Sequence, residues 1–212
     1  ELGAAQSRES QYYNWYSFHP WPEDYDAWWG IKTLPAVQES ADSYRRFIIR
    51  DGDSVVRHWL RQGASGWRLD VADELPDDFI AEIRSAMDQE KPDSFLLGEV
   101  WEDGSNKIAY SQRRRYLLGS ETNGLMNYPF RTAALDWLRG GDAACFRGTM
   151  EVIREHYPRP AFYSALNILG THDTPRILTL LGAEDVPDTK DGRAAYRLSP
   201  AQRQKGQARL RV

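Results

Sequence analysis

The 212-residue chain has a single cysteine, Cys145, so it cannot form an internal disulfide. No apolar run approaches the ~18 residues of a membrane span, and no His/Cys cluster has the spacing of zinc ligands. Charges of the two signs nearly balance, with 27 Lys and Arg against 31 Asp and Glu, and the only basic run, Arg113 to Arg115, is short. The sequence therefore predicts no membrane, nucleic-acid or metal partner, and it leaves the compartment open, with the cytoplasm favoured.

What the chain does contain is a composition that can build a core, with 41% hydrophobic and 12% aromatic residues. Residues 12–30 hold many aromatics together with prolines and a glycine, which is typical of an ordered loop rather than a regular element. Residues 42–62 have the spacing of two short helices, broken at Gly52, with Asp53 as the expected cap of the second.

Strand and helix patterns then alternate along the chain. Apolar runs predict strands at 66–71, 95–101, 124–128 and 165–170, and helical spacing predicts helices from 77 to about 91, 132–138, 142–155, 174–181 and from 199 onward. Two of these helices have a cap-and-proline start, Thr174 with Pro175 and Ser199 with Pro200.

This alternation predicts an α/β fold with a parallel sheet and right-handed crossovers. Four strands are too few for a closed eight-stranded barrel, and no Gly-rich nucleotide turn is present, so we expect a partial (β/α)8 TIM barrel of about four βα units. We expect an aromatic-rich loop segment at 1–40 and the partial barrel at 41–212, with both ends continuing in a longer protein.

Three acidic residues each follow an apolar run that has a strand pattern: Asp70, Glu99 and Asp173. Buried strands avoid charge, and the carboxyl ends of parallel strands meet at one edge, so these acids suggest one shared site. Cleaving a glycosidic bond with retention needs two carboxyl groups about 5 to 5.5 Å apart, one ionised and one protonated.

The neighbours of these acids indicate how the two roles would be divided. Arg68 lies at strand spacing from Asp70, so its guanidinium is expected to keep that carboxylate ionised. Glu99 is flanked by apolar residues, which are expected to raise its pKa and suit it as a general acid. Asp173, beside His172, could bind sugar hydroxyls and favour a positively charged transition state.

Each acid alone also has a purely structural interpretation: an Arg68–Asp70 ion pair, a turn cap at Glu99, and a helix N-terminal acid at Asp173. Asp70 with Asp73 and Glu74 could instead form the metal site of a metal-dependent hydrolase, although solvated loop charge is the favoured interpretation of the extra acids.

Taken together, the segments GWRLDVADE, LLGEVWED and LNILGTHDTPR resemble three signature segments of the alpha-amylase superfamily of glycoside hydrolases. WWGIKTLPAVQ and LMNYPF make the chain most similar to the neopullulanase, cyclomaltodextrinase and maltogenic amylase branch, over about residues 28–181. The resemblance implies strands four to seven of the family barrel, Asp70 as nucleophile, Glu99 as acid/base, Asp173 as transition-state stabiliser, and Arg68 and His172 beside them. The family's first signature and eighth-strand region are absent.

We therefore expect a retaining alpha-glucan hydrolase without a cofactor, acting on α-1,4 links of an alpha-glucan or maltooligosaccharide, with α-1,6 and cyclodextrin activity left open. Trp101 lies on the same side of its strand as Glu99 and either lines this site or packs in the core, whereas packing is favoured for the N-terminal tryptophans. The alternative function is a noncatalytic carbohydrate-binding or scaffold protein. We expect the 212 residues alone to be inactive, because half a pocket cannot fix the sugar, and to self-associate through open sheet edges.

Overall fold

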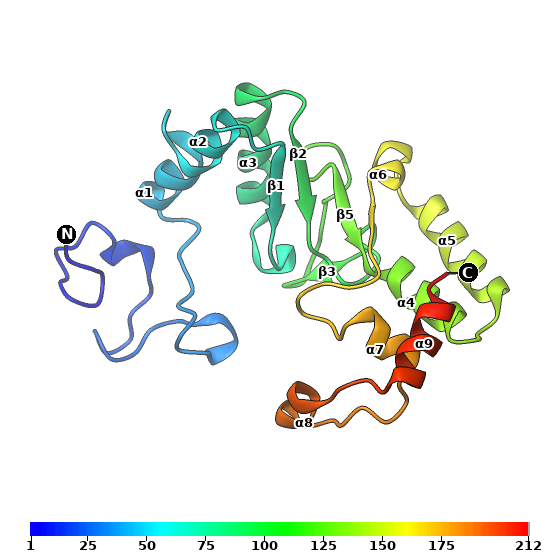
Figure 1. The fold of residues 1–212 in the computed structure, drawn as a ribbon. Helices are drawn as coiled ribbons and strands as arrows, with labels where there is room; N and C mark the ends of the chain where they lie inside the picture. The colour runs from blue at the N-terminus through cyan, green and yellow to red at the C-terminus, as the bar shows by residue number, and fades with distance from the viewer. Residues whose placement is uncertain (212) are drawn as a thin grey trace. The chain divides into compact units, whose positions relative to one another are not determined.

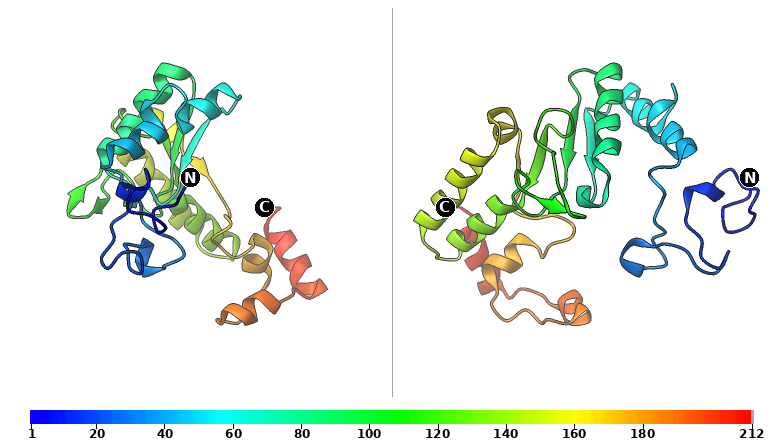
Figure 2. Two further views of the ribbon diagram at one scale, coloured as in Figure 1. Left: turned by 90° about the vertical axis from the view of Figure 1, so that its left-hand side faces the viewer. Right: turned by 180° about the vertical axis from the view of Figure 1, so that it is seen from behind.

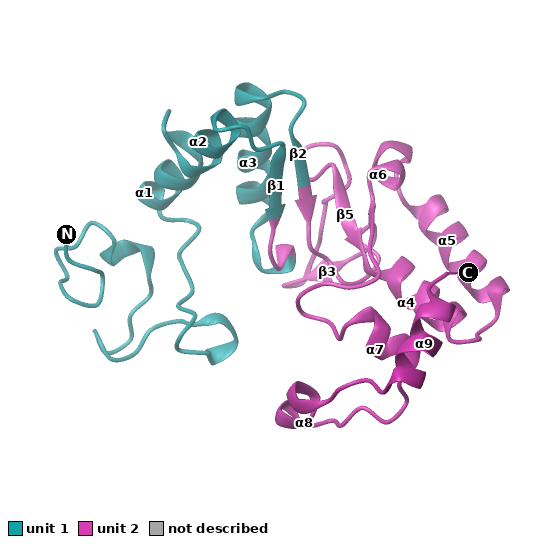
Figure 3. Cartoon of the chain, viewed as in Figure 1, with its two compact units in different colours: residues 1–68, 73–96 teal, residues 69–72, 97–212 magenta. Residues whose placement is uncertain are grey.

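The structure is a computed structural model that describes residues 1–211 (Figure 1). The chain forms two compact units, one made of residues 1–68 and 73–96 and the other of residues 69–72 and 97 onward (Figure 3). Among residues 1–211, no helix is both long and apolar enough to cross a membrane.

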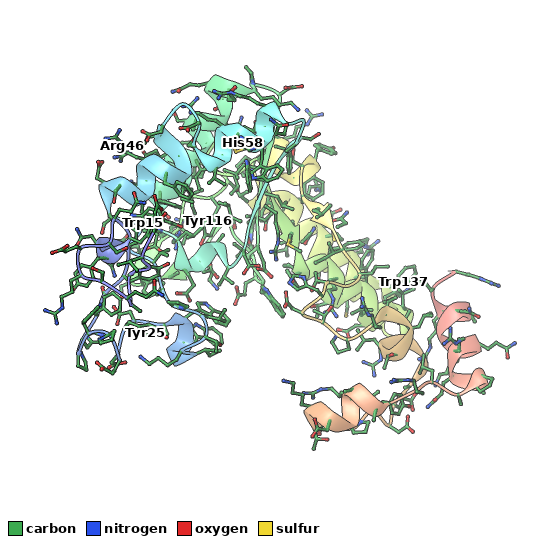
Figure 4. All side chains as sticks on the ribbon, turned by 60° about the vertical axis from the view of Figure 1, so that its left-hand side comes forward. Trp15, Tyr25, Arg46, His58, Tyr116 and Trp137 are labelled. Atoms are coloured by element: carbon green, nitrogen blue, oxygen red, sulfur yellow. The ribbon has the colours of Figure 1, made fainter. Side chains whose placement is uncertain are left out.

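The first unit begins with the aromatic-rich segment, which is ordered but mostly irregular. It contains two 3-10 turns, η1 (Tyr13–Trp15) and η2 (Trp28–Gly30), and its strand-like pairings are isolated bridges such as Tyr16 with Val37. Trp15, labelled in Figure 4, donates its indole N–H to Ser43 Oγ at 2.9 Å, and its ring contacts Tyr44. The expected ordered loop is therefore present, and aromatic packing holds it.

The helices of the first unit follow the expected pattern with one change of cap. Their bounds are α1 (Asp42–Arg45), the π-helical η3 (Arg46–Arg50), α2 (Val55–Arg61), the 3-10 turn η4 (Ala72–Glu74), which spans both units, and α3 (Asp77–Glu90). The helix expected from Asp77 is confirmed, and Phe79, Ile80 and Ile83 on its apolar face are buried. Asp53 as the cap of α2 is wrong: Ser54 occupies the cap position, and its buried hydroxyl donates to the Ile49 carbonyl oxygen.

The four strands form one sheet in the order β1–β2–β5–β6, namely β1 (Gly66–Leu69), β2 (Phe95–Gly98), β5 (Gly124–Asn127) and β6 (Leu166–Asn167). β5 is parallel to both of its neighbours, as the alternation predicts. The expected strand at 165–170 is much shorter in the structure, because only Leu166 and Asn167 pair with β5.

The second unit carries six helices in the described part of the chain: α4 (Tyr128–Leu138), α5 (Ala143–His156), α6 (Arg159–Tyr163), α7 (Ile177–Gly182), α8 (Lys190–Ala195) and α9 (Pro200–Arg209). Trp137 of α4, labelled in Figure 4, stacks on Phe146 of α5, and α7 lies beside α9 in both views of Figure 2. The predicted start of α9 is confirmed, with Ser199 as the cap and Pro200 in the first turn, and Gln202 adds a capping box.

Two helix starts differ from the expectation. α4 begins directly after β5, because Asn127 accepts a hydrogen bond from Phe130 N and caps the helix four residues early. α7 begins at Ile177 rather than at Thr174, because the Thr174 hydroxyl accepts from Thr171 N at 2.9 Å and closes a turn instead.

The connection from β2 to β5 contains no helix in the described structure. It contains a small hairpin, β3 (Ile108–Ala109) and β4 (Gln112–Arg113), and then turns inward. Tyr116, labelled in Figure 4, is fully buried here, so this loop supplies core side chains in place of a covering helix.

Candidate active site

Glu99 is the most enclosed of the predicted site residues. It directly follows β2 and has only 4% of its surface exposed. Its Oε2 accepts from Val71 N at 2.9 Å, and its Oε1 accepts from Trp101 Nε1 at 3.0 Å and from the Tyr128 hydroxyl at 3.3 Å. Three donors from three parts of the chain therefore fix the position of this carboxyl group.

Asp70 is exposed and directly follows β1. The next residue, Val71, has a φ of 41°, a left-handed conformation that is strained for a β-branched side chain and costs on the order of 1–3 kcal/mol. This same conformation presents the Val71 N–H to Glu99. The segment that carries Asp70 is therefore tied to Glu99 through its backbone.

Asp173 and His172 are exposed and lie in the loop after β6, where His172 Nε2 contacts Asp173 Oδ2 at 3.2 Å. Thr171 Oγ1 accepts from Asp173 N at 3.3 Å and lies 3.5 Å from the Tyr128 hydroxyl. Tyr128, which directly follows β5, thus touches both Glu99 and the Thr171 turn, so one network joins the ends of four strands.

The pKa of the Tyr128 phenol reflects its burial first and the two nearby acids second. Burial raises the pKa of its phenol most, and the negative charges of Glu99 and Asp173 raise this pKa further, whereas the hydrogen bond with Thr171 lowers it. The net pKa is raised, so the phenol stays protonated at neutral pH and keeps its hydrogen-bonding proton.

Trp101 lies at the rim of this network. Its indole N–H is bonded to Glu99, and its ring stacks on Tyr128 with centroids 4.4 Å apart and planes 14° apart. Because 49% of the residue is exposed, one face of the indole remains open beside the Glu99 carboxyl.

Arg68 lies in β1, two residues before Asp70, and is partly buried in the first unit. Its action on Asp70 stays a prediction. Among residues 1–211, no group of three or more His, Cys, Asp or Glu side chains has the arrangement of a metal site.

The sequence reasoning missed Tyr128 and Thr171 as members of the site. Tyr128 had a usable signal, because it follows a strand end just as Asp70 and Glu99 do. Thr171 had none, since a threonine in a polar turn is ordinary until the fold brings it to Tyr128.

A parallel α/β sheet with acids and hydrogen-bonding groups gathered at the carboxyl ends of its strands defines the class of barrel-type enzyme sites. Residues 6–199 match the family model of the alpha amylase catalytic domain, and the chain belongs to this family. The resemblance found in the sequence and the partial α/β barrel are both confirmed.

Sequence relatives of known activity support the assignment to the alpha-amylase family. The chain is 34% identical to an amylopullulanase of Thermoanaerobacter thermohydrosulfuricus, over 93% of this chain and 15% of the relative. It is 31% identical to a cyclomaltodextrinase of Geobacillus thermopakistaniensis, over 82% of this chain and 29% of the relative. Glycosidases of the alpha-amylase type are thus its relatives.

A solved structure gives the fold independently. The cyclic alpha-maltosyl-(1→6)-maltose hydrolase of Arthrobacter globiformis, in complex with maltose, superposes with a TM-score of 0.73 and 28% identity, covering 84% of this chain and 39% of that one. The chain therefore spans well under half the length of these relatives and corresponds to part of a catalytic domain.

Proposed function

We propose that the complete protein is a retaining alpha-glucan hydrolase that cleaves α-1,4 links, with α-1,6 links and cyclodextrins as further substrates to test. The observation that carries the proposal is the network centred on Glu99. Through Val71 and Tyr128 it ties together the segments that bear Asp70 and Asp173. A retaining mechanism needs a nucleophile and an acid close together, and this network supports that arrangement.

In the first step, a carboxylate oxygen of Asp70 attacks the anomeric carbon while the bond to the leaving oxygen breaks. The Glu99 proton moves to that oxygen, and the products are a glycosyl ester on Asp70 and a free sugar hydroxyl. Asp173 favours the positive charge that develops on the ring, and this interaction is strongest in the transition state.

In the second step, Glu99 takes a proton from water, the water oxygen bonds to the anomeric carbon, and the ester bond to Asp70 breaks. Two inversions at the same carbon restore the original configuration. The cycle is balanced by one water consumed and needs no cofactor.

Tyr128 can accommodate both states of Glu99. Its hydroxyl can donate to Glu99 Oε1 when that group is ionised, or accept from it when it is protonated while donating to Thr171 Oγ1. The open face of Trp101 beside Glu99 suits the apolar face of a glucose ring at the cleavage point.

The test is a matched pair of substitutions in the complete protein. Glu99→Gln should lower kcat on maltoheptaose by about 10²- to 10⁴-fold, the contribution typical of general acid–base catalysis. Glu102→Gln is the control, because Glu102 is exposed, three residues away, and paired with Lys107 at 2.5 Å. Equal kcat for both variants would contradict the role of Glu99.

Stereochemistry and trapping test the rest of the mechanism. NMR of the first product should show the α anomer, and a fluorinated glucosyl fluoride should leave a covalent adduct on the peptide that contains Asp70. An initial β anomer would refute retention. Glucan binding without hydrolysis would favour the noncatalytic carbohydrate-binding alternative.

A further inference from the structure

A closed turn in the first unit presents two adjacent tryptophans, Trp28 and Trp29. Trp28 N donates to the Leu34 carbonyl at 2.9 Å, and Ala36 N donates to the Asp26 carbonyl at 3.0 Å. A bridge between Ala27 and Pro35 closes the same turn. These backbone hydrogen bonds close residues 26–36 into a turn that carries both tryptophans.

Trp29 differs from the tryptophans that hold the N-terminal segment together. Trp15 bonds to Ser43, and Trp21 donates its indole N–H to the Ala4 carbonyl at 3.0 Å, as expected for packing residues. Trp29 is 77% exposed, so packing as its role is wrong. Its φ of 49° is strained for a bulky residue, and strained residues concentrate at functional sites.

The exposed indole is also fixed in orientation. Its ring stacks on Trp28, with centroids 4.8 Å apart and planes 9° apart, which covers one face and leaves the other open. Its N–H points to Glu74 Oε1 at 3.4 Å, a long hydrogen bond within the same unit. The result is a flat apolar surface with a carboxylate at its edge.

We propose that Trp29 is a binding platform for a glucosyl unit of an alpha-glucan chain, with Glu74 accepting a sugar hydroxyl. This proposal rests on the proposed function for its ligand class. An indole face matches the C–H face of a pyranose ring, and the carboxylate satisfies the hydroxyls at the ring's edge.

The charge beside the indole argues against an apolar protein surface as the occupant. Ile31 and Leu34 nearby are also exposed, at 44% and 48%, so a protein partner is the competing reading. Such a partner would strip water from Glu74 without supplying hydrogen bonds, at a cost that a sugar's hydroxyls avoid.

The experiment compares Trp29→Ala with Trp59→Ala in the complete protein carrying Glu99→Gln, so that binding is measured without hydrolysis. Trp59 is the matched control, because it is 52% exposed on α2 and its ring meets that of His58 edge-on rather than in a stack. Affinity for amylopectin is measured by comparing migration in gels with and without this glucan. Trp29→Ala should bind amylopectin about two- to twelvefold more weakly, the range expected for loss of an aromatic stack, whereas Trp59→Ala should bind it normally. Trp29→Phe should recover part of the loss.

Two results would overturn the platform: normal amylopectin affinity in Trp29→Ala, whether or not its Tm falls, and an equal loss of affinity in both alanine variants. On the Glu99-intact background, the KM for amylopectin should rise with kcat unchanged. Binding and turnover are measured separately, so the test of the Trp29 platform does not depend on whether the protein hydrolyses glucan, and the test of hydrolysis does not depend on the platform.

Discussion

The loop that follows Glu99 packs so closely against the sheet that adding one methyl group to it should lower the free energy of unfolding. Leu125 of β5 is 1% exposed and lies between two glycines. A Cβ added at Gly104 would lie 2.1 Å from Leu125 Cδ1, and one added at Gly98 would lie 2.8 Å from Leu125 Cδ2. Both distances are well below van der Waals contact, so each methyl group of Leu125 packs directly against a different glycine.

Gly104→Ala should therefore destabilise the fold. Inserting a methyl group into a well-packed core costs about 1–3 kcal/mol, and the upper half of this range is expected because Leu125 is buried and its other methyl group already packs against Gly98. Gly104 N also donates to the Tyr157 hydroxyl at 3.2 Å. Burial raises the pKa of Tyr157 to about 12, so this acceptor stays neutral and would be lost if the loop moved.

Urea unfolding gives the test, and the chain offers its own control. Gly148→Ala lies in α5 with no atom within 4 Å of the added Cβ, and it should stabilise by about 0.5–1 kcal/mol through helix propensity. Leu125→Val should rescue Gly104→Ala, with a coupling above about 0.5 kcal/mol in the double-mutant cycle. A Gly104→Ala variant as stable as wild type, or strict additivity with Leu125→Val, would refute the packing argument.

Three further predictions concern a site tyrosine, an acidic ion pair and the two edges of the sheet. Tyr128→Phe keeps the stack on Trp101 but loses the hydrogen bonds of the hydroxyl. We expect kcat to fall about two- to twelvefold, which corresponds to about 0.5–1.5 kcal/mol, with KM little changed. An unchanged kcat would contradict the role of Tyr128. Burial alone would raise the pKa of Asp103, but hydrogen bonds from His156 and Ser105 outweigh it and lower this pKa. The stabilisation is therefore complete above the unfolded pKa of ~3.9 and is lost as the pH falls from there through the lowered folded pKa. Asp103→Asn should flatten that acid limb in denaturation curves, and a limb of unchanged steepness would exclude the pair as its cause. The isolated chain should self-associate, because β1 and β6 each have one neighbour in the described sheet, and light scattering showing a monomer at all concentrations would count against this.

Much of the fold was predictable because its signals are local. The apolar spacing of α3, the Ser199–Pro200 start of α9 and the apolar runs of β1, β2 and β5 each depend on residues within one element. That Asp70 and Glu99 lie at the carboxyl ends of strands was predictable for the same reason, although the strands end at Leu69 and Gly98, just before the acids, rather than at 71 and 101. The local signal misplaced the starts of α2 and α7, where Ser54 bonds to the Ile49 carbonyl and Thr174 bonds to Thr171 N instead of following the predicted capping pattern.

The sequence by itself determined the element types, the family and the acids that end the strands. Only the tertiary structure decided which groups contact Glu99, because these contacts join residues far apart in the sequence. Val71 and Tyr128 lie 28 and 29 residues from Glu99, and Thr171 lies 43 residues from Tyr128. It also decided that Trp29 faces outward while Trp15 packs inward. Such outcomes depend on which surfaces fold against one another, and no short stretch of sequence contains that information.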